Sequence, residues 1–74
     1  MTTVDASYLV AAFSFPGGEE EELYRSALEG RGRIVTSLSD LAGFARGLSA
    51  LGWDQELVRA AVLHAARACT VEKR

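Results

Sequence analysis

Hydrophobic residues recur at helical spacing throughout the second half of the chain. Leucine, phenylalanine and alanine occupy positions 41, 44, 45, 48 and 51, and an aspartate follows Ser37 by three positions. This pattern predicts an amphipathic helix over residues 37–51 that is capped by Ser37. A second stripe of the same period predicts a helix over residues 54–69 with Asp54 as its cap. This second stripe contains Leu57, Val58, Ala61, Val62, Ala65, Ala68 and Cys69.

The first half has shorter and less regular apolar segments. Residues 8–15 form an almost continuous apolar run that stops at Pro16-Gly17-Gly18. Apolar side chains on both alternating faces favour a buried strand, although a helix capped by Asp5 fits the same residues and stays open as an alternative. Residues 19–29 open with four glutamates and predict a short helix with Leu23, Ala27 and Leu28 as its inner stripe, because carboxylates stabilise the positive end of a helix dipole. The β-branched run at residues 34–36 predicts a short strand.

These elements predict a small α+β domain over residues 1–74. The expected order is β-α-β-α-α, with the last two helices forming a C-terminal pair. If residues 8–15 are helical instead, the alternative is an all-α four-helix domain. A chain of 74 residues buries only about 60% of its unfolded surface, so association with a partner or with a second copy would help to stabilise it. Since the single cysteine, Cys69, cannot form a disulfide within the chain, we expect a homodimer or a protein complex.

The charge balance limits the classes of partner. Ten acidic and eight basic side chains give a net charge of −2, which provides no long-range attraction for nucleic acid or for an anionic membrane surface. The apolar run at residues 8–13 is much shorter than the roughly 20 residues that span a bilayer. We therefore expect a cytoplasmic protein without a membrane partner.

Residues for catalysis or metal binding are few. The only histidine, His64, lies at the margin of an apolar helix face and is predicted to be a boundary residue that is satisfied by a neighbour. His64 and Cys69 lack the spacing of a metal motif, and the chain has neither a P-loop nor a dinucleotide-binding glycine pattern. The sequence predicts no enzymatic activity, no cofactor and no metal.

Small residues on the helix at 37–51 form a possible docking strip. Gly43, Gly47 and Ala50 share one face with Arg46, and glycine inside a helix costs about 1 kcal/mol relative to alanine. Two such glycines suggest that another backbone lies close to this face of the helix. That backbone belongs either to the same chain, as internal packing, or to a partner. Both explanations stay open at the level of the sequence.

Leu63 stands between two arginines on the outer face of the last predicted helix, as an anchor of an interface would. Trp53, in the connection between the two helices, is either a closure of the core or a binding hot spot. The predicted partner-binding residues are Gly43, Arg46, Gly47, Ala50, Trp53, Arg59, Leu63 and Arg67.

These features favour a non-enzymatic protein-protein interaction module that acts as a small regulatory, accessory or inhibitory protein and associates with itself. Small bacterial and phage proteins often have this profile of size and composition. One alternative is a helix-turn-helix regulator that binds DNA, although Asp54 and Glu56 would then face phosphates. The second alternative rests on Ser37-Leu38, which resembles the Asp-Ser-Leu motif of acyl carrier proteins with Thr36 in place of the aspartate. This resemblance implies a carrier function for Ser37.

Overall fold

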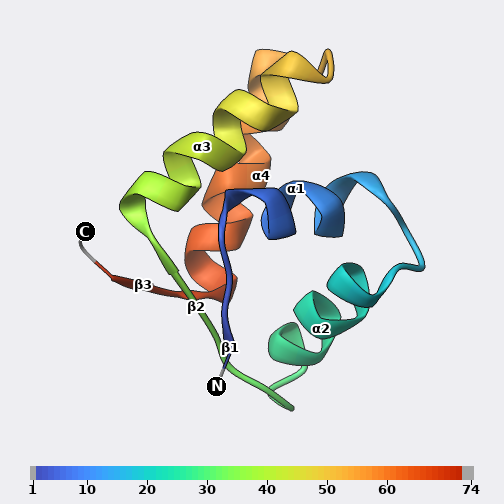
Figure 1. The fold of residues 1–74 in the computed structure, drawn as a ribbon, viewed down its shortest axis with the longest axis vertical. Helices are drawn as coiled ribbons and strands as arrows, with labels where there is room; N and C mark the ends of the chain where they lie inside the picture. The colour runs from blue at the N-terminus through green and yellow to red at the C-terminus, as the bar shows by residue number, and fades with distance from the viewer. Residues whose placement is uncertain (1, 73–74) are drawn as a thin grey trace.

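Four helices and a three-stranded parallel sheet make up residues 2–72, the part of the chain that the computed structural model describes (Figure 1). In chain order the elements are β1 (Thr2–Thr3), α1 (Ala6–Ser14), α2 (Glu19–Leu28), β2 (Ile34–Ser37), α3 (Leu38–Ala50), α4 (Gln55–Ala68) and β3 (Thr70–Glu72). The predicted α+β class is confirmed. The predicted order is incomplete, because two helices separate each strand from the next. No helix within residues 2–72 is long and apolar enough to cross a bilayer.

The predicted strand at residues 8–15 is wrong, because this segment forms α1. The side chain of Asp5 accepts a hydrogen bond from the backbone N–H of Tyr8 at 2.9 Å and caps the helix. Leu9 and Ala12, three positions apart, are the residues that α1 buries. A run with two alanines and a single β-branched residue, Val10, has little intrinsic preference for a strand. The helical alternative for this segment is therefore the correct one.

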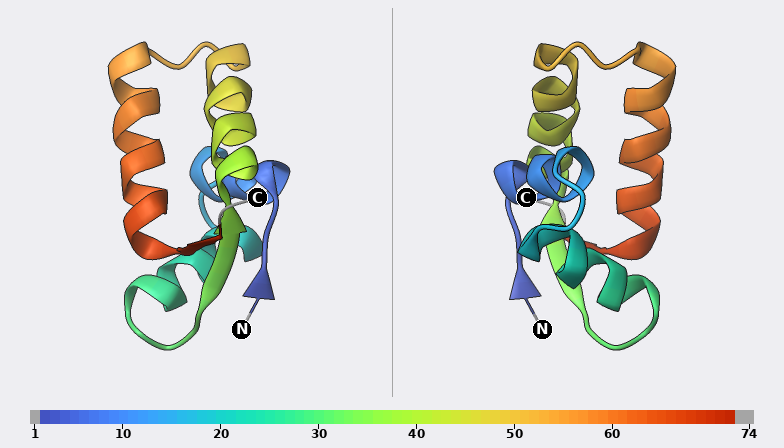
Figure 2. Two further views of the ribbon diagram at one scale, coloured as in Figure 1. Left: turned by 90° about the vertical axis from the view of Figure 1, so that its left-hand side faces the viewer. Right: turned by 90° about the vertical axis from the view of Figure 1, so that its right-hand side faces the viewer.

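The sheet is centred on β2, whose four residues are all buried. The predicted strand at residues 34–36 is confirmed and extends to Ser37. Strand β1 pairs with it in parallel through Thr2–Ile34 and Thr3–Val35, and β3 pairs on its other side through Val35–Thr70 and Thr36–Val71. The two views of Figure 2 show α2 behind β2 from one side and in front of it from the other. The apolar core accordingly lies between the sheet and the helices.

The two predicted C-terminal helices are confirmed, and both begin at the predicted caps. The Ser37 hydroxyl accepts the N–H of Asp40 at 3.1 Å, and the Asp54 carboxylate accepts the N–H of Glu56 at 3.4 Å. Between these helices Gly52 has a φ of +91°, a conformation that residues with a side chain rarely adopt. The turn reverses the chain, so that α3 and α4 run antiparallel (Figure 2).

Four aromatic rings, one from each helix, form a cluster where the helices pack together. Phe13 of α1 has its ring centroid 5.2 Å from Tyr24 of α2 and 5.1 Å from Phe44 of α3. The His64 ring of α4 completes the cluster at 6.0 Å from Phe13. Edge-to-face and tilted contacts of this kind add about 0.5–1.5 kcal/mol per pair to the area that they bury. This aromatic cluster therefore ties the four helices together.

Candidate functional site

The glycine strip on α3 is covered by α1. A Cβ added to Gly43 would lie 3.0 Å from the Cβ of Ala6, and one added to Gly47 would lie 2.7 Å from Cγ2 of Val10. Gly43 and Gly47 are one helical turn apart on α3, and Ala6 and Val10 are one turn apart on α1. Because the two glycines have no side chains, α1 can approach α3 closely over this turn. Of the two explanations that the sequence left open for these glycines, internal helix packing is therefore the one that the contacts support.

The remaining predicted partner residues fall into three places. Arg46 and Ala50 are exposed on α3, outside the glycine contact, and Trp53 is partly buried where it packs against the core. Arg59, Leu63 and Arg67 are exposed along α4. The structure therefore does not bring the eight predicted residues together into one surface.

A hollow of about 460 Å³ lies where the C-terminal half of α4 faces α2. Leu63 is 53% exposed here and Leu28, at the end of α2, is 51% exposed. The hollow is lined by Leu28, Ala60, Leu63, His64, Arg67 and Ala68. Two half-exposed leucines, one from each helix, thus share a concave surface with one arginine at its edge.

A second hollow of about 240 Å³ adjoins the first, because both include Leu28. It is lined by Ala12, Phe13, Glu21, Tyr24, Arg25 and Leu28. These residues belong to α1 and α2, so we use the name α2–α4 groove for the larger hollow alone. Two predicted partner residues, Leu63 and Arg67, lie in this groove, whereas Arg59 on the same helix does not.

Tyr24 of α2 and His64 of α4 contact each other directly. The Tyr24 hydroxyl and Nδ1 of His64 form a hydrogen bond of 2.6 Å, and the two rings stack with centroids 5.5 Å apart. The expectation of a boundary histidine satisfied by a neighbour agrees with this contact. Tyr24 lines the smaller hollow and His64 lines the larger one, so this hydrogen bond links α2 to α4 beside both hollows.

Sequence reasoning missed Leu28, which it assigned to the inner stripe of its helix. Leu23 and Ala27 are partly buried against the core as expected, but Leu28 follows Ala27 by one position and so points about 100° away. The same geometry exposes Leu57 at the start of α4, next to the buried Val58. An apolar residue at the edge of a stripe is the signal that could have identified the groove.

Charges are distributed unevenly around the two hollows. Arg25 forms an ion pair with Glu21 at 3.1 Å at the outer end of the smaller hollow. Within residues 2–72, by contrast, no carboxylate lies within ion-pair distance of Arg67 at the larger hollow. Among residues 2–72, the larger hollow therefore has an arginine in its lining without an ion-pair partner.

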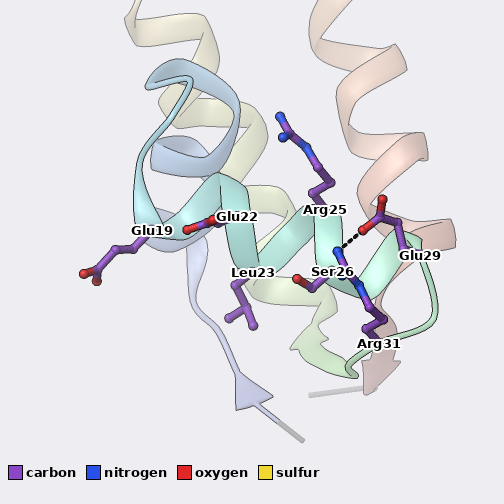
Figure 3. Close-up of a pocket in the computed structure, with 7 residues that line it drawn as sticks. All are labelled: Glu19, Glu22, Leu23, Arg25, Ser26, Glu29 and Arg31. Carbon is purple, nitrogen blue, oxygen red and sulfur yellow. Dashed lines mark hydrogen bonds and ion pairs between the residues drawn. The ribbon is translucent and has the colours of Figure 1, made fainter.

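The outer face of α2 carries a larger but open and polar depression of about 720 Å³ (Figure 3). Glu29 and Arg31 form an ion pair there, while Glu19 and Arg25 point away in different directions. In a catalytic or ion-binding site the functional groups converge on a common point, whereas these side chains do not. Among residues 2–72, no three potential ligands from histidine, cysteine, aspartate and glutamate gather closely enough to hold a metal.

Ser37, the residue behind the acyl-carrier resemblance, is buried at the end of the central strand. Its hydroxyl donates to the Asp40 carboxylate at 2.8 Å while it accepts the Asp40 N–H. A carrier serine must be reached by a modifying enzyme, whereas this hydroxyl is engaged in capping α3. Helix capping is a sufficient explanation for a serine at position 37.

Two buried groups make the stability of the domain sensitive to alkali. Burial raises the pKa of the Tyr24 hydroxyl, with a smaller contribution from Cys69, and burial also raises the pKa of the Cys69 thiol. Below the ordinary values of 10.0 and 9.0 both groups are neutral in the folded and unfolded chain. Above these values the unfolded chain releases its protons first, so the free energy of unfolding falls as pH rises.

We therefore expect unfolding experiments to show a loss on the order of 1 kcal/mol between pH about 8 and about 10.5. Tyr24→Phe removes one of the two groups and should give a smaller loss over the same interval, measured by denaturant titration with the fluorescence of Trp53. An equal slope for the variant and the parent protein would show that Tyr24 does not contribute. Cys69→Ala provides the matching measurement for the thiol.

Comparisons with known proteins assign no function to the groove. No family model matches the chain, and neither a curated protein nor a solved structure is significantly similar to it.

Proposed function

We propose that this chain is a non-enzymatic protein-binding module and that its partner binds in the α2–α4 groove. The observation that carries the proposal is the concave surface shared by Leu28 and Leu63, each about half exposed. Apolar side chains in a hollow with a charged edge are typical of the centre of a protein interface. Burying two such leucines provides about 1 kcal/mol or more for each, which is a useful part of a moderate binding energy.

The form of the groove supports binding rather than chemistry. Its lining is mostly alanine and leucine, with Arg67 and with His64, which is held by its hydrogen bond to Tyr24. The Tyr24 hydroxyl, whose pKa burial raises above its ordinary value of 10.0, is protonated at neutral pH and takes part in this hydrogen bond. A rigid apolar surface of this kind suits recognition of a partner's side chains.

The two alternatives from the sequence receive less support. For DNA binding, the start of α4 would meet phosphates with Asp54 and Glu56, both of which are exposed. For an acyl carrier, Ser37 is buried and engaged as a helix cap. Self-association was expected from the size of the chain and is compatible with the groove, but it needs a matching element on the second copy.

The proposal is tested by capturing partners from a lysate of the source organism with a tagged chain. Leu63→Asp places a carboxylate in the groove and should reduce retention of the partner by about tenfold or more, because a buried unpaired charge is costly. The matched control is Leu38→Asp, since Leu38 is 51% exposed at the start of α3 and does not line the groove.

We expect the parent chain and Leu38→Asp to retain the same protein in comparable amounts, and circular dichroism to show that both variants are folded. Retention of that protein by Leu63→Asp would contradict the proposal. So would a parent chain that retains no protein in stoichiometric amount, with or without nuclease treatment.

A further inference from the structure

One face of α4 points away from the core of its own chain. Four exposed residues follow one another there at intervals of four, three and four positions: Glu56, Ala60, Leu63 and Arg67. This spacing places them on one face of a helix, over a length of about 16 Å. The buried residues of α4 lie on the opposite face and are Val58, Ala61 and Ala65. We call the four exposed residues the α4 seam, and Figure 2 shows that α4 forms one side of the molecule.

The two ends of the α4 seam carry opposite charges. Glu56 stands in the first turn of α4 and Arg67 in its last turn. Among residues 2–72, neither of these side chains forms an ion pair. Between them lie a small side chain, Ala60, and a large one, Leu63, which is 53% exposed. Along the helix the order is therefore acidic, small, large and basic.

This order is complementary to itself when it is reversed. In an antiparallel pair of α4 helices with a twofold axis between Ala60 and Leu63, Glu56 lies opposite Arg67 of the second copy. Ala60 lies opposite Leu63 of the second copy, so that a large side chain fits over a small one, as in the packing of paired helices. The symmetry repeats both contacts. A parallel pair would instead place like charges opposite each other at both ends of the seam.

We propose that the partner in the α2–α4 groove is a second copy of the chain, bound through an antiparallel pair of α4 helices about a twofold axis. This inference rests on the proposed function and names the partner. Ala60, Leu63 and Arg67 belong to the α4 seam and also line the groove. Leu63 of each copy would therefore cover Ala60 in the groove of the other copy, where the half-exposed Leu28 borders the same hollow.

The contact between the two copies is short, because one helix of 14 residues supplies most of it on each side. Interfaces smaller than about 1,200 Å² are typical of weak complexes. We expect a monomer–dimer equilibrium with a dissociation constant on the order of 1–100 μM. Sedimentation velocity or light scattering of the purified chain between about 1 μM and 1 mM would measure it, since this range brackets the expected constant.

A single charge reversal should weaken the dimer. In Arg67→Glu a carboxylate faces Glu56 of the second copy, and the symmetry produces this repulsion at both ends of the seam. The dissociation constant should rise about tenfold or more, and Glu56→Arg should have a similar effect. The matched control is Arg46→Glu, which makes the same charge change at an exposed position of α3 and should alter the constant by about twofold or less.

The double variant Glu56→Arg/Arg67→Glu tests the antiparallel pairing. Its two charges are exchanged, so each arginine again faces a glutamate of the second copy, and the dissociation constant should return to within about threefold of the parent value. Because the exchanged charges oppose the dipole of α4, circular dichroism must show that the variant is folded. A folded double variant that stays as weak as either single variant would overturn the inference, as would equal constants for Arg67→Glu and Arg46→Glu.

The outcome is separable from that of the proposed function. A dimer that Leu63→Asp dissociates, with the untagged chain retained by the tagged one, would support both proposals. A parent chain that stays monomeric at about 1 mM, while Leu63→Asp still abolishes capture of another protein, would leave the groove as the binding surface and overturn the second copy as its partner. If Leu63→Asp changes neither capture nor dimerisation, both proposals fail.

Discussion

Replacing Gly47 by leucine is expected to destabilise the domain by about 2–3 kcal/mol, because the new side chain would occupy the space of α1. A Cβ at this position already lies 2.7 Å from Cγ2 of Val10, which is closer than real Cβ contacts. The remaining three carbons of leucine have no cavity to enter between the two helices. The better helix propensity of leucine returns less than about 1 kcal/mol. A domain of this size has roughly 4–11 kcal/mol in total, so the loss is a large fraction of its stability.

The measurement is a urea titration followed by circular dichroism and by the fluorescence of Trp53. Ala42→Leu is the control, since Ala42 is exposed on the same helix and the same added side chain should change the stability by about 0.5 kcal/mol or less. A Gly47→Leu chain as stable as the parent would mean that α1 does not rest on α3 as described. A shift in the midpoint for both variants would point to α3 itself and not to its contact with α1.

The second half of the fold was predictable because its signals are local. Helices α3 and α4 have long apolar stripes and side-chain caps at Ser37 and Asp54, and β2 is a β-branched segment. Helix α2 was predictable from its glutamates, which suit the N-terminal end of a helix. Each of these elements is specified by residues within its own segment.

The first half was harder because its structure depends on distant contacts. Periodicity alone leaves residues 8–15 compatible with a strand or a helix, and the packing of α1 over Gly43 and Gly47 is a contact that this segment makes only as a helix. Strands β1 and β3 have two and three residues, which is too short for a periodic pattern. They exist because the central strand β2 offers a hydrogen-bonding edge on each side.

The groove was only half visible in the sequence for a related reason. Leu63 and Arg67 could be identified because they stand on the outer face of a well-predicted helix. Their neighbour Leu28 comes from α2, well before them in the chain, and sequence periodicity does not report which faces of two helices meet. The glycine strip, by contrast, correctly indicated a close helix contact, but the partner was α1 of the same chain.

Replacing Phe44 by alanine should have the largest effect on stability, about 3–5 kcal/mol, which is a large fraction of the roughly 4–11 kcal/mol that a domain of this size has in total. Phe44 is 0% exposed, and its ring centroid lies 5.1 Å from that of Phe13. Removing the ring both loses its buried surface and leaves a cavity beneath the aromatic cluster that joins the four helices.

The cost should scale with the volume that is removed. Phe44→Leu keeps most of the side chain and is expected to lose about 1–1.5 kcal/mol, while Leu51→Ala, at a position 58% exposed, should change stability by about 0.5 kcal/mol or less. Urea midpoints of the three variants, read by circular dichroism, provide the comparison. A loss below about 1 kcal/mol for Phe44→Ala would contradict a core centred on this ring.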